Sequence, residues 1–340
     1  MKIHKDFSLK ELNTFGVDAN AKFFVELKDA DQIKEFLSMA DYKKMKRLVI
    51  GGGSNLLFTQ DFDGVVIKIK NKGITVEKSE DSTLYIKAAA GEMWDDLVQF
   101  CIEHNLGGIE NLVMIPGTVG SSPIQNIGAY GVELKDVFYE LEALNLQTLK
   151  LEKFNKDDCK FAYRNSIFKG ELKDKYIVLN VTIKLLKNPI EFNLNYGSID
   201  KELCRVNAYD MNLPMVAEAV RTIRRRKLPD PAVLGNAGSF FKNPVITAKK
   251  FESLKITHSP ELPGYVSSTS EVKIPAAWLI ERAGWKGKKI GTVGVHKNQP
   301  LVIVNLGNAT GAEILNLSEE IKESVLDKFG IELETEVIIL

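Results

Sequence analysis

The most constraining stretch of the sequence is a glycine-containing loop at 227–244, which reads K-L-P-D-P-A-V-L-G-N-A-G-S-F-F-K-N-P. Its two prolines predict that the preceding basic helix ends here, because proline lacks the backbone N–H that a helix needs. The adjacent Phe240 and Phe241 predict an anchor in the hydrophobic core, since two exposed phenyl rings would be costly. An anchored loop that presents Ser239 beside cations is suited to chemistry. The same residues also fit a glycine-rich turn whose serine caps a helix.

The composition predicts a soluble, cytoplasmic protein of two or three domains. The chain has 340 residues, of which 44% are hydrophobic, enough for a sizeable core. Basic and acidic residues both number 45, and this balance argues against nucleic acid as a main partner. No run reaches the roughly 18 apolar residues of a membrane span. The three cysteines form no C-x-x-C pair, which fits a reducing compartment, and the scattered histidines predict no metal site.

A second glycine run follows a predicted strand at 47–50 and reads Gly51-Gly52-Gly53-Ser54-Asn55. Consecutive glycines after a strand can bring backbone N–H groups onto a phosphate. The run lacks the spacing of a P-loop or of G-x-G-x-x-G, and it also fits a plain tight turn. Upstream, the pattern predicts a strand at 22–27 and a helix at 29–42, whose Ile33, Phe36, Leu37 and Ala40 share one face.

The middle of the chain predicts strands, one amphipathic helix and an unusual neutral loop. Short strands at 65–70, 74–77 and 84–90 suggest a meander, and a helix is expected at 93–104. The loop at 115–131 contains glycines, Ser121, Ser122, Gln125, Asn126 and Tyr130 and no charged residue. We interpret it as a loop wrapped on a large neutral ring system. A long solvated loop fits less well, because solvated loops normally carry charge.

Further strands are predicted at 137–145 and 176–186, and between them lies an arginine framed by apolar residues. Arg164 is flanked by aromatic residues and Ile167, which predicts a half-buried guanidinium. Such an arginine suits bidentate binding of a carboxylate, and it equally suits a structural ion pair. Tyr196 adds a phenol at a predicted turn, a weak signal by itself.

The last third predicts helices at 210–227, 247–254, 275–283 and 310–329. A proline- and glycine-rich loop at 259–265 is long enough to act as a lid. The final strand is expected at 331–340, where Glu332, Glu334 and Glu336 alternate on one face. Alternation alone favours a solvated edge.

Four separated stretches resemble, in order, the UDP-N-acetylenolpyruvoylglucosamine reductase family of peptidoglycan synthesis, in its longer, type I form. They are Gly51–Asn55, Pro116–Gly131, Tyr163–Ser166 and Gly235–Pro244. The resemblance spans nearly the whole chain, and the second and fourth stretches are highly specific. It departs from the family at the end. The family's E-V-R pattern reads Glu336-Val337-Ile338 here, so the arginine is missing.

The resemblance implies an α+β protein with an FAD-binding fold of the PCMH, or vanillyl-alcohol-oxidase-like, type, and a C-terminal substrate-binding α+β domain. We expect the first FAD-binding subdomain at 1–70, the second at 71–218, and the substrate-binding domain at 219–330. The final strand at 331–340 could return to the second subdomain.

The resemblance further implies an NADPH-dependent, FAD-mediated reduction of UDP-N-acetylglucosamine enolpyruvate to UDP-N-acetylmuramate. The implied catalytic residues are Ser239 as general acid, Arg164 and Glu336. The implied FAD-binding residues are Gly51, Gly52, Gly53, Ser54, Asn55, Leu56, Ser121, Ser122, Ile124, Gln125, Asn126, Gly128 and Tyr130. The implied substrate-binding residues are Tyr196, Lys227, Asn243, Tyr265 on the lid and Gln299.

We expect a monomer that binds a small-molecule substrate and neither nucleic acid nor membrane. Two other classes remain open. A flavin oxidase of the same fold would share Gly117–Gly131 but should lack the Ser239 loop and the Tyr265 lid. A binding or regulatory relative would hold flavin without turnover, and the altered C-terminus keeps that reading open.

Overall fold

The computed structural model describes residues 1–196, 198–205, 211–268 and 270–340, and these form two compact units. Unit 1 comprises residues 1–7, 21–52 and 62–225. Unit 2 comprises residues 8–20, 53–61 and 226–340. The glycine run at 51–55 is therefore divided between the units after Gly52. The three-part division expected from the resemblance stays a prediction.

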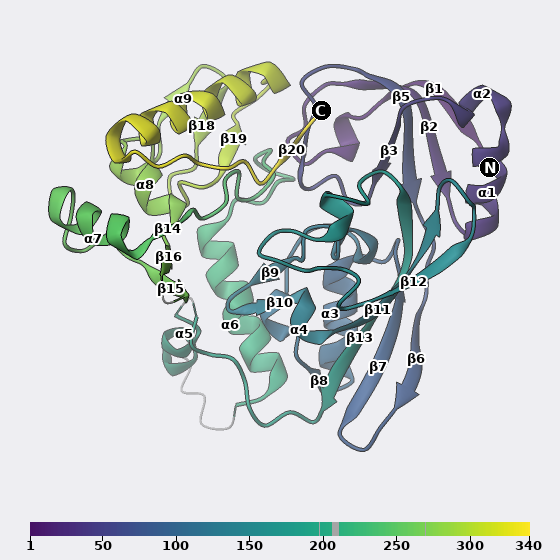
Figure 1. Cartoon of the computed structure of the whole chain (residues 1–340), viewed down its shortest axis with the longest axis horizontal. Helices are drawn as coiled ribbons and strands as arrows, with labels where there is room; N and C mark the ends of the chain where they lie inside the picture. The colour runs from purple at the N-terminus through teal and green to yellow at the C-terminus, as the bar shows by residue number, and fades with distance from the viewer. Residues whose placement is uncertain (197, 206–210, 269) are drawn as a thin grey trace. The chain divides into compact units, whose positions relative to one another are not determined.

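The first sheet of unit 1 is a four-stranded sheet in the order β1-β2-β5-β3 (Figure 1). Its strands are β1 (Ile3–Ser8), β2 (Asn20–Leu27), β3 (Arg47–Ile50) and β5 (Phe62–Ile69). Both β2 and β3 run parallel to β5. The strand predicted at 65–70 thus belongs to this sheet and not to a meander. Local alternation cannot distinguish the two arrangements, because strand partners depend on long-range packing.

Two helices, α1 (Ala30–Ser38) and α2 (Ala40–Lys43), follow β2, where a single helix was predicted. The Asp29 carboxylate caps α1 by accepting a hydrogen bond from the backbone N–H of Gln32 at 2.8 Å. The extended conformation of Met39 separates the helices. Ile33, Phe36 and Leu37 are buried as predicted, whereas Ala40 is exposed beyond the break.

The second sheet of unit 1 is antiparallel and has the order β12-β11-β13-β7-β6, with β8 pairing to β13. Its strands are β6 (Ile74–Ser79), β7 (Thr83–Ala89), β8 (Leu106–Gly107), β11 (Phe138–Asn145), β12 (Leu151–Asn155) and β13 (Tyr176–Lys187). The pairing of β6 with β7 confirms that part of the predicted meander. Strand β12 was not predicted, because its sequence is mostly polar and its exposed edge leaves little pattern.

The main core of unit 1 lies between this second sheet and two amphipathic helices. These helices are α3 (Trp94–Glu103) and α6 (Leu213–Lys227), which contribute Trp94, Leu97, Val98, Val216 and Val220 to one buried cluster. The start predicted for α6, Asp210, lies outside the described residues. The short helices α4 (Leu134–Val137) and α5 (Ile199–Arg205) complete the unit, with the 3₁₀ turns η2 (Glu110–Leu112), η3 (Val119–Ser121) and η4 (Ile167–Lys169).

Unit 2 contains three small sheets, the helices α7 (Ala248–Thr257), α8 (Ala276–Arg282) and α9 (Gly311–Phe329), and the 3₁₀ turn η1 (Lys10–Leu12). The sheets have the orders β14-β16-β15, β17-β18-β19 and β20-β4. Their strands are β4 (Leu56–Leu57), β14 (Val245–Thr247), β15 (Tyr265–Ser268), β16 (Glu271–Lys273), β17 (Lys289–Ile290), β18 (Val293–Val295), β19 (Ile303–Asn305) and β20 (Ile338–Ile339). The buried faces of α8 and α9 and the two adjacent phenylalanines form one core.

The predicted boundaries of α9 are confirmed by its two ends. Thr310 forms a capping box with Glu313, and Gly330 ends the helix with a φ of 60°. The long final strand predicted at 331–340 is wrong in extent. The described chain has an isolated bridge between Thr335 and Phe241, and then β20, which pairs in parallel with β4. The segment therefore pairs with Phe241 and with β4, and the return of the final strand to the second subdomain stays a prediction.

Candidate functional site

The predicted site residues fall into two groups, one in each unit. In unit 1, the first two glycines of the 51–55 run lie directly on the neutral loop at 115–131. A Cβ built on Gly52 would lie 2.9 Å from Gly117 Cα, and one built on Gly51 would lie 2.4 Å from Thr118 Oγ1. Real Cβ atoms do not approach so closely, so this backbone contact requires glycine. The two loops that the resemblance assigns to FAD thus form one glycine-lined cradle.

The neutral loop is buried or half-buried along most of its length. Ser122 and Asn126 are both fully buried. Asn126 Nδ2 donates to Ala162 O and to the Glu133 carboxylate, both at 3.1 Å, and its Oδ1 accepts from Lys135 N at 3.0 Å. Both amide hydrogens of Asn126 therefore bind protein groups. This side chain therefore holds the loop in shape.

Arg164 is joined to the same loop. Its guanidinium donates to Gly128 O at 2.5 Å and to Asn126 O at 3.5 Å, and it lies 5.2 Å from the centre of the Tyr163 ring. Ser166 Oγ donates to Ile124 O at 2.7 Å, a second bond between the two segments. Arg164 is half-buried, as predicted. The cation is therefore held beside Gly128 by main-chain carbonyls.

The neutral loop ends in a tight hairpin, β9 (Gly128–Ala129) and β10 (Val132–Glu133). Its two central residues, Tyr130 and Gly131, have φ values of 50° and 82°. A type I′ turn requires positive φ at both positions, which is unusual for a tyrosine. The pKa of the Tyr130 phenol is raised above its ordinary value. Burial is the main cause, nearby Arg224 opposes the shift, and Tyr196 adds to it. The predicted Tyr196 therefore lies near Tyr130, on a segment that is otherwise remote in sequence.

In unit 2, the Ser239 loop is fixed on both sides of the serine. Before it, Gly238 has a φ of 68°, and its N–H donates to Asn236 Oδ1 at 2.9 Å. After it, Phe240 and Phe241 are 0% and 1% exposed, which confirms the predicted core anchor. Ser239 itself is half-buried. The serine is therefore held on a turn and does not cap a helix.

The main chain of Phe240 joins three segments of unit 2. Its N–H donates to Leu301 O, and its carbonyl accepts from the N–H of Glu336, both at 2.8 Å. Glu336 is held again from its other side, because Asn55 Nδ2 donates to its carbonyl at 3.2 Å. The predicted general acid and the predicted glutamate thus lie on two directly hydrogen-bonded segments.

The remaining predicted residues of unit 2 lie on other segments of the chain. Lys227 is exposed at the end of α6, where Asn298 Nδ2 donates to the Arg226 carbonyl at 3.3 Å. That bond ties the helix end to the loop that carries Gln299. Asn243 Oδ1 accepts from Ala276 N at 2.9 Å at the start of α8. Its amide oxygen therefore has a structural partner.

Tyr265 begins β15 in the small sheet β14-β16-β15 and is 52% exposed. It pairs with Lys273 of β16. The predicted lid loop therefore ends in a hairpin strand, and the tyrosine is accessible on it.

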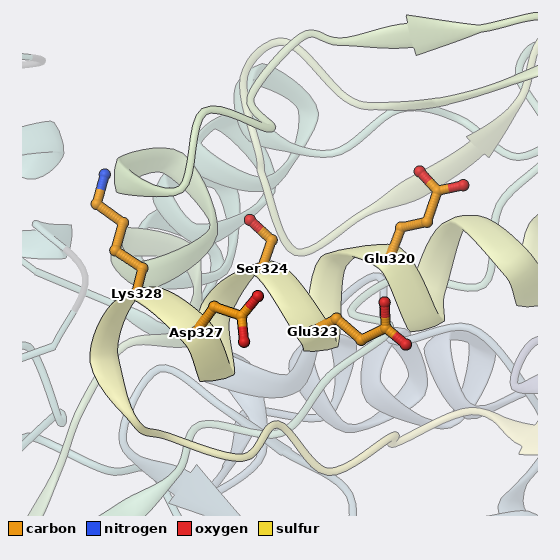
Figure 2. A pocket seen from close by; sticks show the side chains of 5 residues that line it. All are labelled: Glu320, Glu323, Ser324, Asp327 and Lys328. Carbon is orange, nitrogen blue, oxygen red and sulfur yellow. The ribbon is translucent and has the colours of Figure 1, made fainter.

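A separate surface pocket of about 510 Å³ lies on α9 and is lined by Glu320, Glu323, Ser324, Asp327 and Lys328. Figure 2 shows their side chains projecting from neighbouring turns of this one helix. None of the predicted site residues lines it. Its acidic side chains form a solvated helix face, and we assign it no part in the chemistry.

Sequence reasoning missed Asn111, which is fully buried and hydrogen-bonded to the turn at Tyr130. The available signal was a Glu-Asn pair inside an otherwise apolar run at 109–113. Buried polar residues in such a run need internal partners, which marks them as structural or functional. In the part of the chain that the structure describes, no helix has both the length and the apolar character needed to cross a membrane.

Comparisons with known proteins agree with this geometry. Residues 21–148 match a model of the FAD binding domain, and residues 230–340 match the UDP-N-acetylenolpyruvoylglucosamine reductase C-terminal domain. The UDP-N-acetylenolpyruvoylglucosamine reductase of Flavobacterium johnsoniae is 47% identical over 100% of both chains. That of Pseudomonas aeruginosa is 44% identical over 99% of this chain and 98% of the relative. The crystal structure of the Thermus caldophilus reductase (MurB) has a TM-score of 0.69 at 23% identity and covers 100% of this chain and 99% of that one.

The fold and the matched domains define a flavoprotein oxidoreductase whose α+β FAD-binding fold is joined to a C-terminal α+β domain. The chain belongs to the UDP-N-acetylenolpyruvoylglucosamine reductase family.

Proposed function

We propose that this chain reduces UDP-N-acetylglucosamine enolpyruvate to UDP-N-acetylmuramate, with NADPH as the electron donor, in cytoplasmic synthesis of peptidoglycan precursors. The observation that carries the proposal is the pair of 2.8 Å hydrogen bonds through which Phe240 joins the Ser239 loop to the segments of Glu336 and Leu301. Full-length relatives named for this activity support it. We further propose that the chain acts as a monomer.

The glycine-lined cradle suits FAD because its glycines allow close approach of the backbone. Consecutive main-chain N–H groups in such a run can face a phosphate. The chemistry that FAD would supply there is hydride transfer between NADPH and the terminal methylene carbon of the substrate. We assign its binding to Gly51, Gly52, Gly53, Ser54, Asn55, Leu56, Ser121, Ser122, Ile124, Gln125, Asn126, Gly128 and Tyr130.

Hydride addition places negative charge on the carbon next to the substrate carboxylate, so the transition state carries two adjacent negative charges. Arg164 would bind the carboxylate, for which a planar guanidinium is well shaped. Glu336 would donate a hydrogen bond to, or share a proton with, the enolic form. Donors placed where charge develops usually make the largest contribution to catalysis.

Ser239 would complete the reaction by giving its hydroxyl proton to the carbanionic carbon. Such a carbon is basic enough to take a proton from an alcohol, and Lys227 would stabilise the serine oxygen left behind. Tyr196, Asn243, Gln299 and the lid residue Tyr265, with Lys227, would bind the diphosphate and sugar of the substrate.

The visible absorbance spectrum of the purified protein tests cofactor, donor and substrate in sequence. We expect the bands of oxidised flavin, their bleaching by NADPH without oxygen, and their return on addition of the enolpyruvyl sugar nucleotide. Bleaching without return would reject this substrate and favour a flavin oxidase or a binding protein. A colourless protein that takes up no added FAD would contradict the assignment of both glycine loops.

Replacement of Gly52 by alanine is expected to weaken FAD binding by about 5- to 150-fold, the range set by about 1–3 kcal/mol of overpacking. The added Cβ would lie 2.9 Å from Gly117 Cα, so the two loops must separate. FAD affinity can be measured by quenching of flavin fluorescence. Gly170→Ala is the matched control, because a Cβ there meets nothing within 4 Å. Equal FAD affinity in Gly52→Ala and the wild type would show that the contact does not shape the cradle.

A further inference from the structure

A closed set of hydrogen bonds in unit 1 connects the Tyr130–Gly131 turn to the segment that carries Tyr196. Asn111, in η2, donates one amide hydrogen to Tyr130 O at 2.9 Å and the other to Asn193 O at 2.8 Å. Asn193 Nδ2 donates in turn to Gly131 O at 3.2 Å. Three segments from distant parts of the sequence are therefore joined at one buried amide.

The burial of Asn111 shows that this amide is a fixed part of the interior. The residue is 0% exposed, between buried Glu110 and Leu112. A buried carbonyl that loses its donor is costly, so both bonds from Asn111 constrain the carbonyls that accept them. Asn193 is exposed, and its side-chain amide donates to Gly131 O on the turn.

The turn that Asn111 holds is one that a tyrosine adopts poorly. Tyr130 has a φ of 50°, a region in which a bulky residue persists only where its surroundings impose it. Asn111 supplies such a constraint by bonding the Tyr130 carbonyl directly. The conformation of the turn decides where the Tyr130 phenol lies.

The same turn packs against Tyr196. A Cβ built on Gly131 would lie 3.3 Å from Tyr196 Cβ and 3.1 Å from Asn193 Nδ2. The turn and the Tyr196 segment are thus in van der Waals contact as well as hydrogen-bonded. Tyr196 is 42% exposed, so it is accessible to a ligand.

We propose that Asn111 is a positioning residue for the sugar nucleotide, which sets the Tyr130 turn and the Tyr196 segment in one fixed relation. This inference rests on the proposed function, because it takes Tyr196 as a contact of the substrate diphosphate and sugar. Asn111 itself is fully buried. Its effect is transmitted through the two carbonyls that it holds.

The test measures binding of UDP-N-acetylglucosamine, which contains the diphosphate and sugar but lacks the reacting enolpyruvyl group. Asn111→Leu keeps the number and branching of the side-chain heavy atoms and removes both donors, and we expect its Kd for this probe to rise about tenfold. In a Tyr196→Phe background, the same substitution should raise Kd by less than about threefold, because residues that act through one another are not additive. A full tenfold effect in both backgrounds would overturn the proposal.

Two further variants separate positioning from general destabilisation. Asn193→Ala is exposed and removes only the bond to Gly131, and we expect about a threefold rise in Kd for the same probe. Asn145→Leu is the control for general destabilisation. Asn145 Nδ2 donates to Glu152 and Tyr176, and its Oδ1 accepts from the N–H groups of Gln147 and Thr148, at the end of β11 that lies about 23 Å along the strand from Phe138. This variant should lower the Tm and leave Kd unchanged.

Wild-type Kd values in both Asn111→Leu and Asn193→Ala, or an equal rise in Asn145→Leu, would overturn the role of Asn111. These results are distinct from failure of the proposed function, which would appear as reduced flavin that the enolpyruvyl sugar nucleotide does not reoxidise in the wild type.

Discussion

Ser239→Ala is expected to slow reoxidation of the reduced flavin by the enolpyruvyl substrate by roughly 10²–10⁴-fold, the contribution typical of general acid catalysis. Reduction of the flavin by NADPH should keep its wild-type rate, because that step needs no proton from the serine. The two half-reactions can be followed separately by anaerobic stopped-flow absorbance. The substitution would then slow the second half-reaction and leave the first unchanged.

The structure indicates that Ser239→Ala removes the hydroxyl without changing the conformation of the loop. The turn before the serine is set by Gly238 and by its hydrogen bond to Asn236, and the anchor after it is set by two buried phenylalanines. None of these contacts uses the serine hydroxyl, so the loop should keep its shape in the variant. Loss of rate would then report loss of the proton donor.

Ser324→Ala is a suitable control for Ser239→Ala, because it removes a hydroxyl from the exposed pocket on α9 of the same unit. It should leave both half-reactions unchanged. If Ser239→Ala reoxidised at the wild-type rate, another group would have to protonate the substrate. If it slowed both half-reactions equally, its effect would be on the fold or on flavin binding.

The sequence predicted those local structures whose determinants are close together in the chain. The capped helix α9 is specified by Thr310, Glu313 and Gly330, all of which interact within a turn of an end. The core anchor at Phe240 follows from the apolar character of two adjacent residues. Such features depend on nearby residues alone, which is why composition and spacing reveal them.

What the sequence did not predict depends on distant partners. The parallel pairing of β5 with β2 and β3 cannot be read from alternation, which is the same in either kind of sheet. The final segment reads as one long strand, yet it divides between a bridge at Thr335 and the short β20. Its partners, Phe241 and β4, lie far away in the chain.

The candidate site shows the same division. Local motifs indicated Gly52, Arg164 and Ser239 as residue types suited to the chemistry, and only the family resemblance singled out Glu336. Neither identified the neighbours of these residues. Asn55 and Glu336 are hydrogen-bonded although they are 281 positions apart. The role of Asn111 was invisible because it depends on two main-chain carbonyls, whose positions no side-chain motif encodes.

Glu336→Gln is expected to lower the rate of flavin reoxidation by about 10²–10³-fold, because glutamine can donate a hydrogen bond to the enolic form but cannot share a proton with it. Glutamine keeps the shape of the side chain, and the main chain at this position is held by Phe240 O at 2.8 Å and by Asn55 at 3.2 Å. The variant should therefore fold normally and bind substrate with little change in KM. The rate of reoxidation at saturating substrate is the measurement.

Glu332→Gln is the matched control for Glu336→Gln, because Glu332 is an exposed glutamate four residues earlier on the same segment. Its reoxidation rate should stay within about twofold of the wild type, as for most surface substitutions. A similar loss in both variants would mean that the acidic character of the segment matters and not Glu336 itself. A wild-type rate in Glu336→Gln would remove this glutamate from the mechanism.

The double variant Ser239→Ala with Glu336→Gln tests whether the two residues serve one transition state. If Ser239 protonates the same enolic species that Glu336 stabilises, the combined loss should be smaller than the product of the single losses, because effects of residues that act as a unit are strongly non-additive. A combined loss equal to the product of the two single losses would assign the two residues to separate steps. The hydrogen bond from Glu336 N to Phe240 O, one residue beyond Ser239, is the physical reason to expect coupling.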